Sequence, residues 1–212
     1  MTRFLLIDKP AGITSHDVVN QVRKITGEQR VGHAGTLDPF ATGLLIVAVG
    51  RENTKKLNEL VGLDKEYEAV FVLGARSETD DIEGPVISDP NAHEVSRQEI
   101  KTVIKKFIGQ IDQVPPKYAA IKVKGRKLYE AARAGEEIER KPRSVRIDEF
   151  ELLHILPKNK IKVRIKCGSG TYIRALARDL GDELGIGGYV EQLRRTKIGS
   201  FDIKDAVPLN EL

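Results

Sequence analysis

The sequence predicts an α+β fold: a mixed, largely antiparallel sheet flanked by helices. Residues 66–73 and 160–167 alternate along the chain with a period of two, which is typical of strands. Apolar residues recur at helical spacing over 18–25 and again over 100–108. These segments do not follow one another in a regular βαβ order, so a doubly wound parallel sheet is not expected.

Composition places the chain among ordinary globular proteins. Its 212 residues suit one large domain or two small ones, and 40% are hydrophobic and 31% charged. The single cysteine, Cys167, excludes an internal disulfide and lies in a strand pattern, where a buried thiol is expected. Four scattered histidines give no support for a metal site. A net charge of +4 is a mild indication of a polyanionic partner.

The sequence gives no sign of membrane insertion or export. The sequence contains no apolar run long enough to span a bilayer, and its N-terminus does not resemble a signal peptide. We therefore expect a cytoplasmic protein.

The first third of the chain begins with a short buried strand at residues 4–8. Residues 9–15 form a turn, and Ser15 is the expected N-cap of the helix that follows. The apolar run 44–49 predicts a second buried strand, and residues 54–60 predict a short helix.

The rest of the chain is also predicted to contain loops, helices and strands. Residues 75–89 are polar and turn-rich, which predicts a loop. Ser96 and Glu99 have the spacing of a capping box, and the helix behind them ends near Gly109. Residues 145–155 predict a strand that pairs with the strand at 160–167 around a turn, and a further helix follows.

Residues 31–44 show neither helical nor strand periodicity and predict a loop. Gly32 and Gly35 permit unusual backbone angles, and Pro39 pushes Asp38 into an extended conformation. Two interpretations are open for Asp38. It either caps a turn in a connector or is presented to a ligand on a rigid loop.

Residues 113–143 carry nine Lys or Arg against four Glu, with Tyr118 and Tyr129 interleaved. Such a segment suits the backbone and splayed bases of a nucleic acid, although a solvated charged surface has the same composition. The strand at 160–167 has one apolar and one basic face. This basic face either contacts phosphates or is simply an outer surface.

A helix is expected after the glycines of residues 168–174, where its free N–H groups could meet an anion. Arg174 lies in the first turn of this helix, where a positive charge is mildly unfavourable. Its presence there indicates an anionic partner such as a carboxylate.

The stretch Gly32-His-Ala-Gly-Thr-Leu-Asp-Pro39, followed by Ala41-Thr-Gly43, resembles the catalytic loop of the TruB-type tRNA pseudouridine synthases. The likeness extends from Lys9 to Phe201. Further stretches that resemble this family are Lys9–Ser15, Lys65–Ala69, Gln113–Tyr129, Gly170–Arg174 and Leu193–Phe201.

The resemblance implies roles for individual residues. Asp38 would be the nucleophile, Tyr67 the active-site tyrosine that stacks on uracil, and Arg174 the partner of Asp38. The other residues implied to bind the substrate are His33, which enters the tRNA loop, Tyr172 and Leu193 at the base pocket, and Gly35, Thr36 and Lys9.

The resemblance also implies the reaction: uridine in the T loop of tRNA (position 55) is flipped out and isomerised to pseudouridine. No cofactor or metal is required. One catalytic domain would cover residues 1–212, with an inserted thumb at about 113–143 that grips the tRNA arm. The family's small C-terminal RNA-binding domain is expected to be absent. We expect a monomer without a protein or membrane partner.

Three other functions are compatible with parts of the pattern. They are a non-catalytic tRNA-binding or tRNA-folding protein of the same fold, a guide-RNA-dependent pseudouridine synthase, and a ribosome- or metabolite-binding domain. The set of Asp38, Tyr67 and Arg174 favours catalysis, since binding alone does not need a carboxylate in an RNA pocket. The Lys9–Ser15 motif and the lack of extended termini favour the stand-alone bacterial type.

Overall fold

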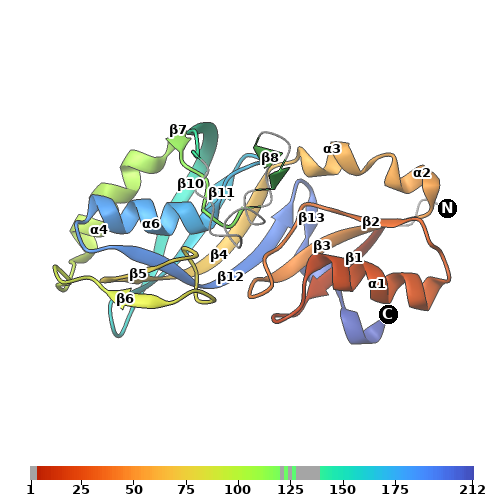
Figure 1. Cartoon of the computed structure of the whole chain (residues 1–212), viewed down its shortest axis with the longest axis horizontal. Coiled ribbons are helices and arrows are strands. Elements are labelled where there is room, and N and C mark those ends of the chain that lie inside the picture. Colours follow the sequence, from red (N-terminus) through yellow and green to blue (C-terminus); the bar gives the residue numbers. More distant parts are fainter. Residues whose placement is uncertain (1–3, 120–121, 124–125, 128–138) are drawn as a thin grey trace. The chain divides into compact units, whose positions relative to one another are not determined.

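A computed structural model describes residues 4–119, 122–123, 126–127 and 139–212 (Figure 1). About half of the predicted thumb, including Tyr129 and Arg133, lies outside these ranges. The chain divides into two compact units, which are described separately below. Unit 1 comprises Met1–Glu68, Ile165–Ser169 and Gln192–Leu212, and unit 2 comprises Ala69–Arg164 and Gly170–Glu191.

Unit 1 contains the N-terminal strands and the end of the chain. Its own elements are β1 (Phe4–Lys9), α1 (Ser15–Thr26), β2 (Val31–Ala34), β3 (Thr42–Val49), α2 (Arg51–Thr54), α3 (Leu57–Val61), β13 (Phe201–Asp202), η2 (Ile203–Asp205), β14 (Val207–Pro208) and η3 (Leu209–Glu211). Three strands contribute residues to both units: β4 (Lys65–Leu73), β11 (Lys160–Cys167) and β12 (Gly188–Ile198).

Unit 2 holds most of the central part of the chain. Its own elements are β5 (Ala75–Ser77), β6 (Val86–Ser88), α4 (Arg97–Ile104), η1 (Lys105–Phe107), β7 (Gly109–Gln113), β8 (Lys122–Val123), β9 (Arg126–Lys127), β10 (Arg143–Leu156) and α6 (Ile173–Glu183).

The sheet of unit 1 has the strand order β14-β1-β3-β12, with β2 added to β3 and β13 to β12. β1 runs antiparallel to β3, from Phe4 opposite Ala48 to Lys9 opposite Gly43. β14 pairs parallel with β1, and β12 pairs parallel with β3. Both directions therefore occur, and the predicted mixed sheet flanked by helices is confirmed.

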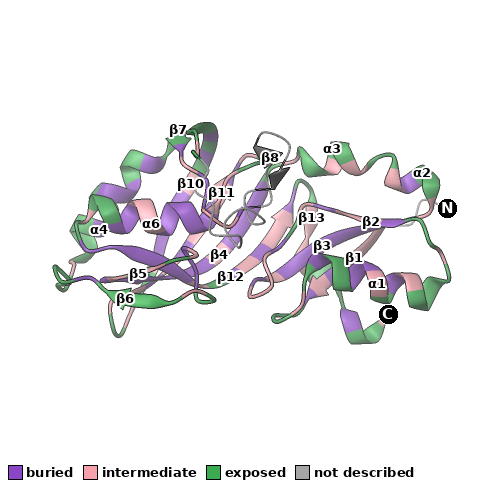
Figure 2. Ribbon diagram, in the orientation of Figure 1, coloured by how far each residue is buried: buried purple, intermediate pink, exposed green. Residues whose placement is uncertain are grey.

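β3 separates two apolar cores because successive side chains of a strand point to opposite faces. On one face, Leu45 and Val47 pack with Ile7 and the buried side of α1. On the other face, Leu44 and Ile46 pack with Ile198 and the side chains of α3. Figure 2 shows nearly all of β3 as buried.

The N-cap of α1 is Thr14 and not Ser15, so that prediction was wrong. The Thr14 hydroxyl accepts a hydrogen bond from the Asp17 amide at 3.1 Å, and the Asp17 carboxylate accepts one from the Thr14 amide at 2.8 Å. This reciprocal pair is a capping box, which a one-residue shift would break. The Ser15 hydroxyl instead bonds the backbone of Leu37.

The irregular segment is shorter than the predicted loop at 31–44. β2 pairs antiparallel with β3, which leaves only residues 35–41 outside regular structure. Gly32 concealed β2, because a glycine does not contribute to an alternating pattern. A β-carbon at Gly32 would lie 2.7 Å from Leu57 Cδ1, so the glycine allows α3 to pack closely. The single helix predicted over 54–60 is two short ones, α2 and α3.

In unit 2 the strand order is β4-β11-β10-β7. The predicted pairing of residues 145–155 with 160–167 is confirmed by β10 and β11, which meet at a turn where Lys158 and Asn159 have positive φ. The rings of Phe71 and Phe107 each pack against Phe150, with centroids 6.2 and 6.3 Å apart respectively. The capping box at the start of α4 is also confirmed.

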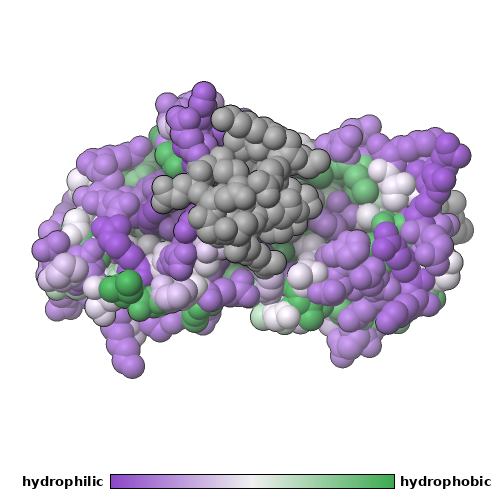
Figure 3. Space-filling model, in the orientation of Figure 1, coloured by the Kyte–Doolittle hydropathy of each residue, from purple (hydrophilic) through white to green (hydrophobic). Residues whose placement is uncertain are grey.

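Residues 75–89, which were expected to be a loop, contain the hairpin of β5 and β6. Its strands have only three residues each, too few to give a clear alternation. Val86 and Ile87 on β6 are exposed, and Figure 3 shows a small apolar area there on a largely hydrophilic face. No helix within the described ranges has the length and apolar character needed to cross a membrane.

Candidate active site

In unit 1, the side chain of Lys9 supports the loop that carries Asp38. Lys9 is fully buried, and its ammonium group donates to the carbonyl oxygens of Pro10 and Ile13, both at 2.8 Å, and of Pro39 at 3.2 Å. The Gly12 amide also donates to the Pro39 oxygen, at 2.9 Å. Two donors thus fix the residue after Asp38. This placement favours a supporting role for Lys9 over contact with a substrate.

The residue before Asp38 is fixed as well. The Ser15 hydroxyl accepts from the Leu37 amide at 2.9 Å and donates to its carbonyl at 3.1 Å, and both side chains are buried. A turn follows, in which the Ala41 amide donates to the Asp38 carbonyl at 3.1 Å. Asp38 is half-buried and lies in non-helical backbone, as Pro39 predicted.

Arg195 of β12 supports the two ends of this loop. It is 1% exposed, and its Nε donates to the Leu44 carbonyl at 2.8 Å and its Nη2 to the Gly35 carbonyl at 3.0 Å. β12 runs beside β3 with Arg195 opposite Gly43. A β-carbon at Gly43 would lie 2.3 Å from the Arg195 oxygen, so this close approach requires glycine.

Tyr67 of β4 is buried and accepts a hydrogen bond from Arg195. Burial raises the pKa of the Tyr67 phenol and the Asp38 carboxylate adds to this rise, whereas the charge and hydrogen bond of Arg195 oppose it. Unit 1 therefore brings Asp38, Tyr67 and Arg195 into one electrostatic cluster.

Two further predicted substrate-binding residues also lie in unit 1. His33 on β2 is half-buried, and burial together with the charges of Arg195 and His16 lowers the pKa of the imidazole, which is therefore neutral at pH 7. Leu193 on β12 is buried.

The beginning of the Asp38 loop supplies the other two predicted residues in this unit. Thr36 is exposed, so its hydroxyl is accessible to a substrate. Gly35 has a φ of +82°, and a β-carbon there would lie 3.5 Å from Nη1 of Arg195. This distance is an ordinary van der Waals contact, so the glycine is favoured by the positive φ of the turn and not by a need for space.

Lys65 is a buried cation that sequence reasoning left without a role. Its ammonium group donates to the carbonyl oxygens of Val61 at 2.6 Å and Leu63 at 2.5 Å. Burial and the nearby Arg195 lower the pKa of Lys65 to about 8.

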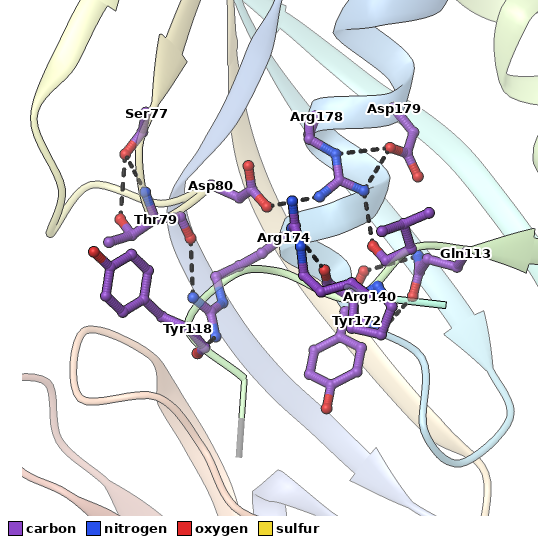
Figure 4. Close-up of polar contacts among 12 residues, drawn as sticks. Ser77, Thr79, Asp80, Gln113, Tyr118, Arg140, Tyr172, Arg174, Arg178 and Asp179 are labelled. Carbon is purple, nitrogen blue, oxygen red and sulfur yellow. Dashed lines mark hydrogen bonds and ion pairs between the residues drawn. The ribbon is translucent and has the colours of Figure 1, made fainter. Parts of the chain in front are cut away.

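Arg174 lies at the start of α6 in unit 2 and is 5% exposed. Its Nη1 forms an ion pair with Asp81 at 3.0 Å. Nη1 also donates to the Thr79 carbonyl at 2.9 Å, and Nη2 donates to the Tyr118 carbonyl at 3.0 Å (Figure 4). Asp81 is a carboxylate partner of the kind expected for Arg174. The pairing with Asp38 implied by the family resemblance stays a prediction.

Tyr172, the N-cap of α6, is held through its backbone. The Gln113 side chain accepts from the Tyr172 amide at 2.8 Å and donates to its carbonyl at 3.1 Å, as Figure 4 shows. Arg178, one helical turn beyond Arg174, bonds Asp80 and the Val114 carbonyl, both at 2.9 Å. Side chains that include both arginines of α6 thus fix residues 113–118.

The basic face of β11 has partners of its own in unit 2. Lys160 pairs with Glu191 at 2.6 Å, and Arg164 pairs with Glu151 at 2.7 Å. These pairs favour an outer surface over a phosphate-binding one. In the part of the chain that the structure describes, no three His, Cys, Asp or Glu side chains form a group suited to a metal ion.

Sequence reasoning missed Arg195, Asp81 and Gln113. The signal for Arg195 was present, because it has the same parity along β12 as the apolar Leu193 and must share its face. Asp81 and Gln113 had no such signal, since each acts on residues more than fifty positions away.

Two family models together match the chain from residue 23 to its end. The model described as "TruB family pseudouridylate synthase (N terminal domain)" matches residues 23–173, and the "tRNA pseudouridylate synthase B C-terminal domain" matches residues 174–212. The first alone spans well over half of the chain.

Curated relatives agree with the family models. The chain is 47% identical over 211 residues to tRNA pseudouridine synthase B of Mycobacterium sp. (strain KMS), covering 98% of this chain and 71% of the relative. The tRNA pseudouridine synthase B of Mycobacterium tuberculosis (strain ATCC 25618 / H37Rv) is also 47% identical over 211 residues, covering 98% of this chain and 70% of the relative.

Solved structures show the same fold. A chain of the Cbf5-Nop10-Gar1 complex matches with a TM-score of 0.77 and 30% identity, covering 99% of this chain and 53% of that one. A chain of an H/ACA RNP bound to a substrate RNA containing 2'-deoxyuridine matches with a TM-score of 0.73 and 28% identity, covering 99% of this chain and 51% of that one. The chain thus spans about half the length of these solved relatives. Taken together, the supported loop around Asp38, the family models and the relatives show that this chain belongs to the TruB family of pseudouridylate synthases.

Proposed function

We propose that the protein isomerises uridine to pseudouridine in the T loop of tRNA, at position 55, with Asp38 as the catalytic carboxylate. The observation that carries the proposal is the loop itself. Leu37 and Pro39 are each held by buried side chains, and the carboxylate between them interacts with the buried Tyr67. The 47% identity to tRNA pseudouridine synthases B supports tRNA as the substrate.

The reaction needs few chemical groups. The bond between N1 of uracil and C1′ of ribose breaks, the freed base turns and a bond forms between C5 and C1′. The proton on C5 leaves, and N1 takes up a proton in its place. No electrons are gained or lost overall. Asp38 would either attack the ribose, attack the base, or form an ion pair while the sugar eliminates to a glycal. Each route needs an ionised carboxylate at a fixed position, which the loop provides.

The other predicted residues would act around this carboxylate. Tyr67 would stack on the uracil, a contact worth about 1–3 kcal/mol, and act as a base toward the sugar. Arg174 would keep Asp38 ionised and correctly aimed. Tyr172 and Leu193 would complete the base pocket.

The target base must leave its stack, at a cost of a few kcal/mol. The neutral His33 is suited to fill the vacated space in the tRNA loop, because a neutral ring can stack without the cost of desolvating a charge. The thumb at 113–143 would grip the T arm. We propose that the protein works as a monomer in the cytoplasm, where its substrate is found.

The Asp38→Asn variant tests this function. Because the amide nearly keeps the size and hydrogen-bonding capacity of the carboxylate, tRNA binding should survive while isomerisation falls by at least about 10³-fold. Tritium release from a T-loop RNA labelled at uridine C5 measures turnover, and filter binding measures affinity. Asp148→Asn, at an exposed acid paired with Arg146, is the matched control and should leave both quantities unchanged.

The same assay separates the alternatives. A purified wild-type protein that binds tRNA without releasing tritium would be a non-catalytic binding or folding protein. Activity that appears only when a guide RNA is added would identify the guide-dependent branch. The higher identity to tRNA pseudouridine synthases B, 47% against 30% for the Cbf5 complex, favours turnover of tRNA alone. Ordinary turnover by Asp38→Asn would show that another group supplies the chemistry.

A further inference from the structure

We infer that Arg195 is a positioning residue for the isomerisation, holding the Asp38 loop and the Tyr67 hydroxyl in a fixed arrangement. This inference rests on the proposed function. Arg195 does not need to touch the substrate, since it would act through the two groups that do.

The hydrogen bonds of Arg195 connect three elements of unit 1. From β12 its guanidinium donates to the Leu44 carbonyl on β3 and to the Gly35 carbonyl at the start of the loop. It also donates to Tyr67 on β4. The planar guanidinium has five N–H groups in a rigid arrangement, so one side chain fixes all three acceptors at set angles. Three separately mobile donors would not do this.

The charge of Arg195 has a use beyond these bonds. A neutral amide could satisfy two backbone carbonyls, and burying a cation instead costs free energy. Carbonyl and hydroxyl acceptors do not cancel the positive charge, which therefore still acts on nearby anions. Asp38 interacts with the same phenol, so the charge favours the ionised carboxylate that the reaction requires.

The bond to Tyr67 also sets the direction of its hydroxyl. Because the phenol oxygen accepts a hydrogen from Arg195, its own proton is left to point elsewhere. The charged or titratable groups that act on this phenol are Arg195 from β12, Cys167 from β11 and Asp38 from the loop. Of these, only Arg195 makes the phenol more acidic.

The neighbouring Arg194 provides an internal comparison. It precedes Arg195 on the same strand and therefore points to the opposite face. Its guanidinium forms a two-point ion pair with Asp8, at 2.6 and 3.1 Å, and its side chain is 42% exposed. Arg194 also donates to the Thr42 hydroxyl at 3.4 Å. Arg194 and Arg195 thus share a strand and a charge, but of the two only Arg195 bonds the Gly35 carbonyl and Tyr67.

The experiment compares Arg195→Lys and Arg195→Gln with the control Arg194→Lys. Single-turnover rates at saturating T-loop RNA, RNA affinity and thermal unfolding are measured for each. Tyrosine labelled with ¹³C at Cζ reports the pKa of Tyr67 by NMR, with its signal assigned from Tyr67→Phe. Arg195→Lys keeps the positive charge but loses the planar arrangement of N–H donors. Arg195→Gln keeps N–H donors but loses the positive charge.

Both Arg195 variants should react about 100-fold more slowly, because a small misplacement of a reacting group has an effect of this size. Their RNA affinity should stay within about threefold of wild type, since no RNA contact is lost. The pKa of Tyr67 should rise in Arg195→Gln and rise less in Arg195→Lys. Arg194→Lys should match wild type in rate, affinity and Tyr67 pKa.

A folded Arg195→Lys that reacts within threefold of wild type would overturn the inference. So would a slow, folded Arg195→Gln in which the Tyr67 pKa does not move, because the arginine would then affect the rate without acting on the Tyr67 hydroxyl. If Arg195→Gln does not fold, the rate of Arg195→Lys decides. A wild-type protein that never forms pseudouridine, while its Tyr67 pKa still responds to Arg195, refutes the proposed function and not the hydrogen bond.

Discussion

Each unit buries cationic side chains beside the residues proposed for the site. The groups that accept hydrogen bonds from these cations differ between the two units. In unit 1, Lys9, Lys65 and Arg195 donate to backbone carbonyl oxygens. In unit 2, Arg174 and Arg178 of α6 form ion pairs with aspartates, and Figure 4 shows that of Arg178 with Asp80.

The difference appears in the pKa values. Burial and the nearby Arg195 lower the pKa of Lys65 to about 8, because carbonyl groups do not compensate for the lost hydration of a charge. Burial also lowers the pKa of Arg178, but the carboxylates of Asp80 and Asp179 outweigh it, so the net direction is upward. Lys65 in unit 1 thus carries its charge at a cost in stability, whereas the carboxylates of Asp80 and Asp179 stabilise the charge of Arg178 in unit 2.

The two arrangements suit two tasks. An uncancelled charge acts on any nearby anion, and in unit 1 the carboxylate of Asp38 belongs to the cluster of Tyr67 and Arg195. A neutralised arginine is chiefly a rigid connector, and in unit 2 two of them fix the backbone of residues 113–118. We therefore expect substitutions in unit 1 to change the chemistry first and most substitutions in unit 2 to change stability first.

Among the substitutions that test this comparison, Arg174→Ala has the largest expected effect on the rate, and it would place one unit 2 residue outside this rule. If Arg174 also stabilises Asp38, as the family resemblance implies, the single-turnover rate should fall by about 100-fold or more while tRNA affinity changes by less than threefold. The matched control is Arg146→Ala, an exposed arginine paired with Asp148. Equal losses in rate and affinity would make Arg174 a phosphate contact or a purely structural residue.

Much of the fold was predictable because it depends on local patterns. The alternation around Tyr67 predicted β4, and the spacing of Ser96 and Glu99 predicted the start of α4. The loop at Asp38 was recognisable in part from Gly35 and Pro39, which lie outside regular structure, although Gly32 and Gly43 lie in β2 and β3. Each of these features is encoded within about ten residues of sequence.

What the sequence did not reveal depends on distant partners. Thr14 and Ser15 are both residue types that favour the N-cap position. The hydrogen bonds between the Ser15 hydroxyl and the Leu37 backbone leave Thr14 as the N-cap of α1. The support that Arg195 gives the loop spans 160 positions, so no local pattern shows it. Whether Arg174 has one carboxylate partner or two is a question of the same kind.

Asp81→Asn should have the next largest effect and tests the unit 2 half of the comparison. It leaves the buried Arg174 without the charge of its partner, and breaking such a pair costs about 3–5 kcal/mol of unfolding free energy. The amide keeps some hydrogen bonding, so about 2–4 kcal/mol is expected in urea unfolding. Asp148→Asn, at an exposed pair, should change stability by less than about 0.5 kcal/mol. A similarly small change for Asp81→Asn would mean that the neutralisation of Arg174 by Asp81 does not stabilise unit 2.

Lys65→Met tests the unit 1 half of the comparison through its pH dependence. The folded pKa of about 8 lies below the ordinary 10.5, so between these values the unfolded chain binds a proton that the folded chain does not. The stability of the wild type relative to Lys65→Met should therefore rise from pH 8 to 10.5, by at most about 1.4 kcal/mol per pH unit.

Lys55→Met, at an exposed lysine paired with Glu52, is the control for the titration of the other lysines. Its stability difference from wild type should stay nearly flat over the same range, because an exposed group has almost the same pKa in both states. A flat difference for Lys65→Met as well would mean that its carbonyl partners compensate fully for burial. The positive charge attributed to unit 1 would then carry no cost, and the contrast with the aspartate-paired arginines of α6 would disappear.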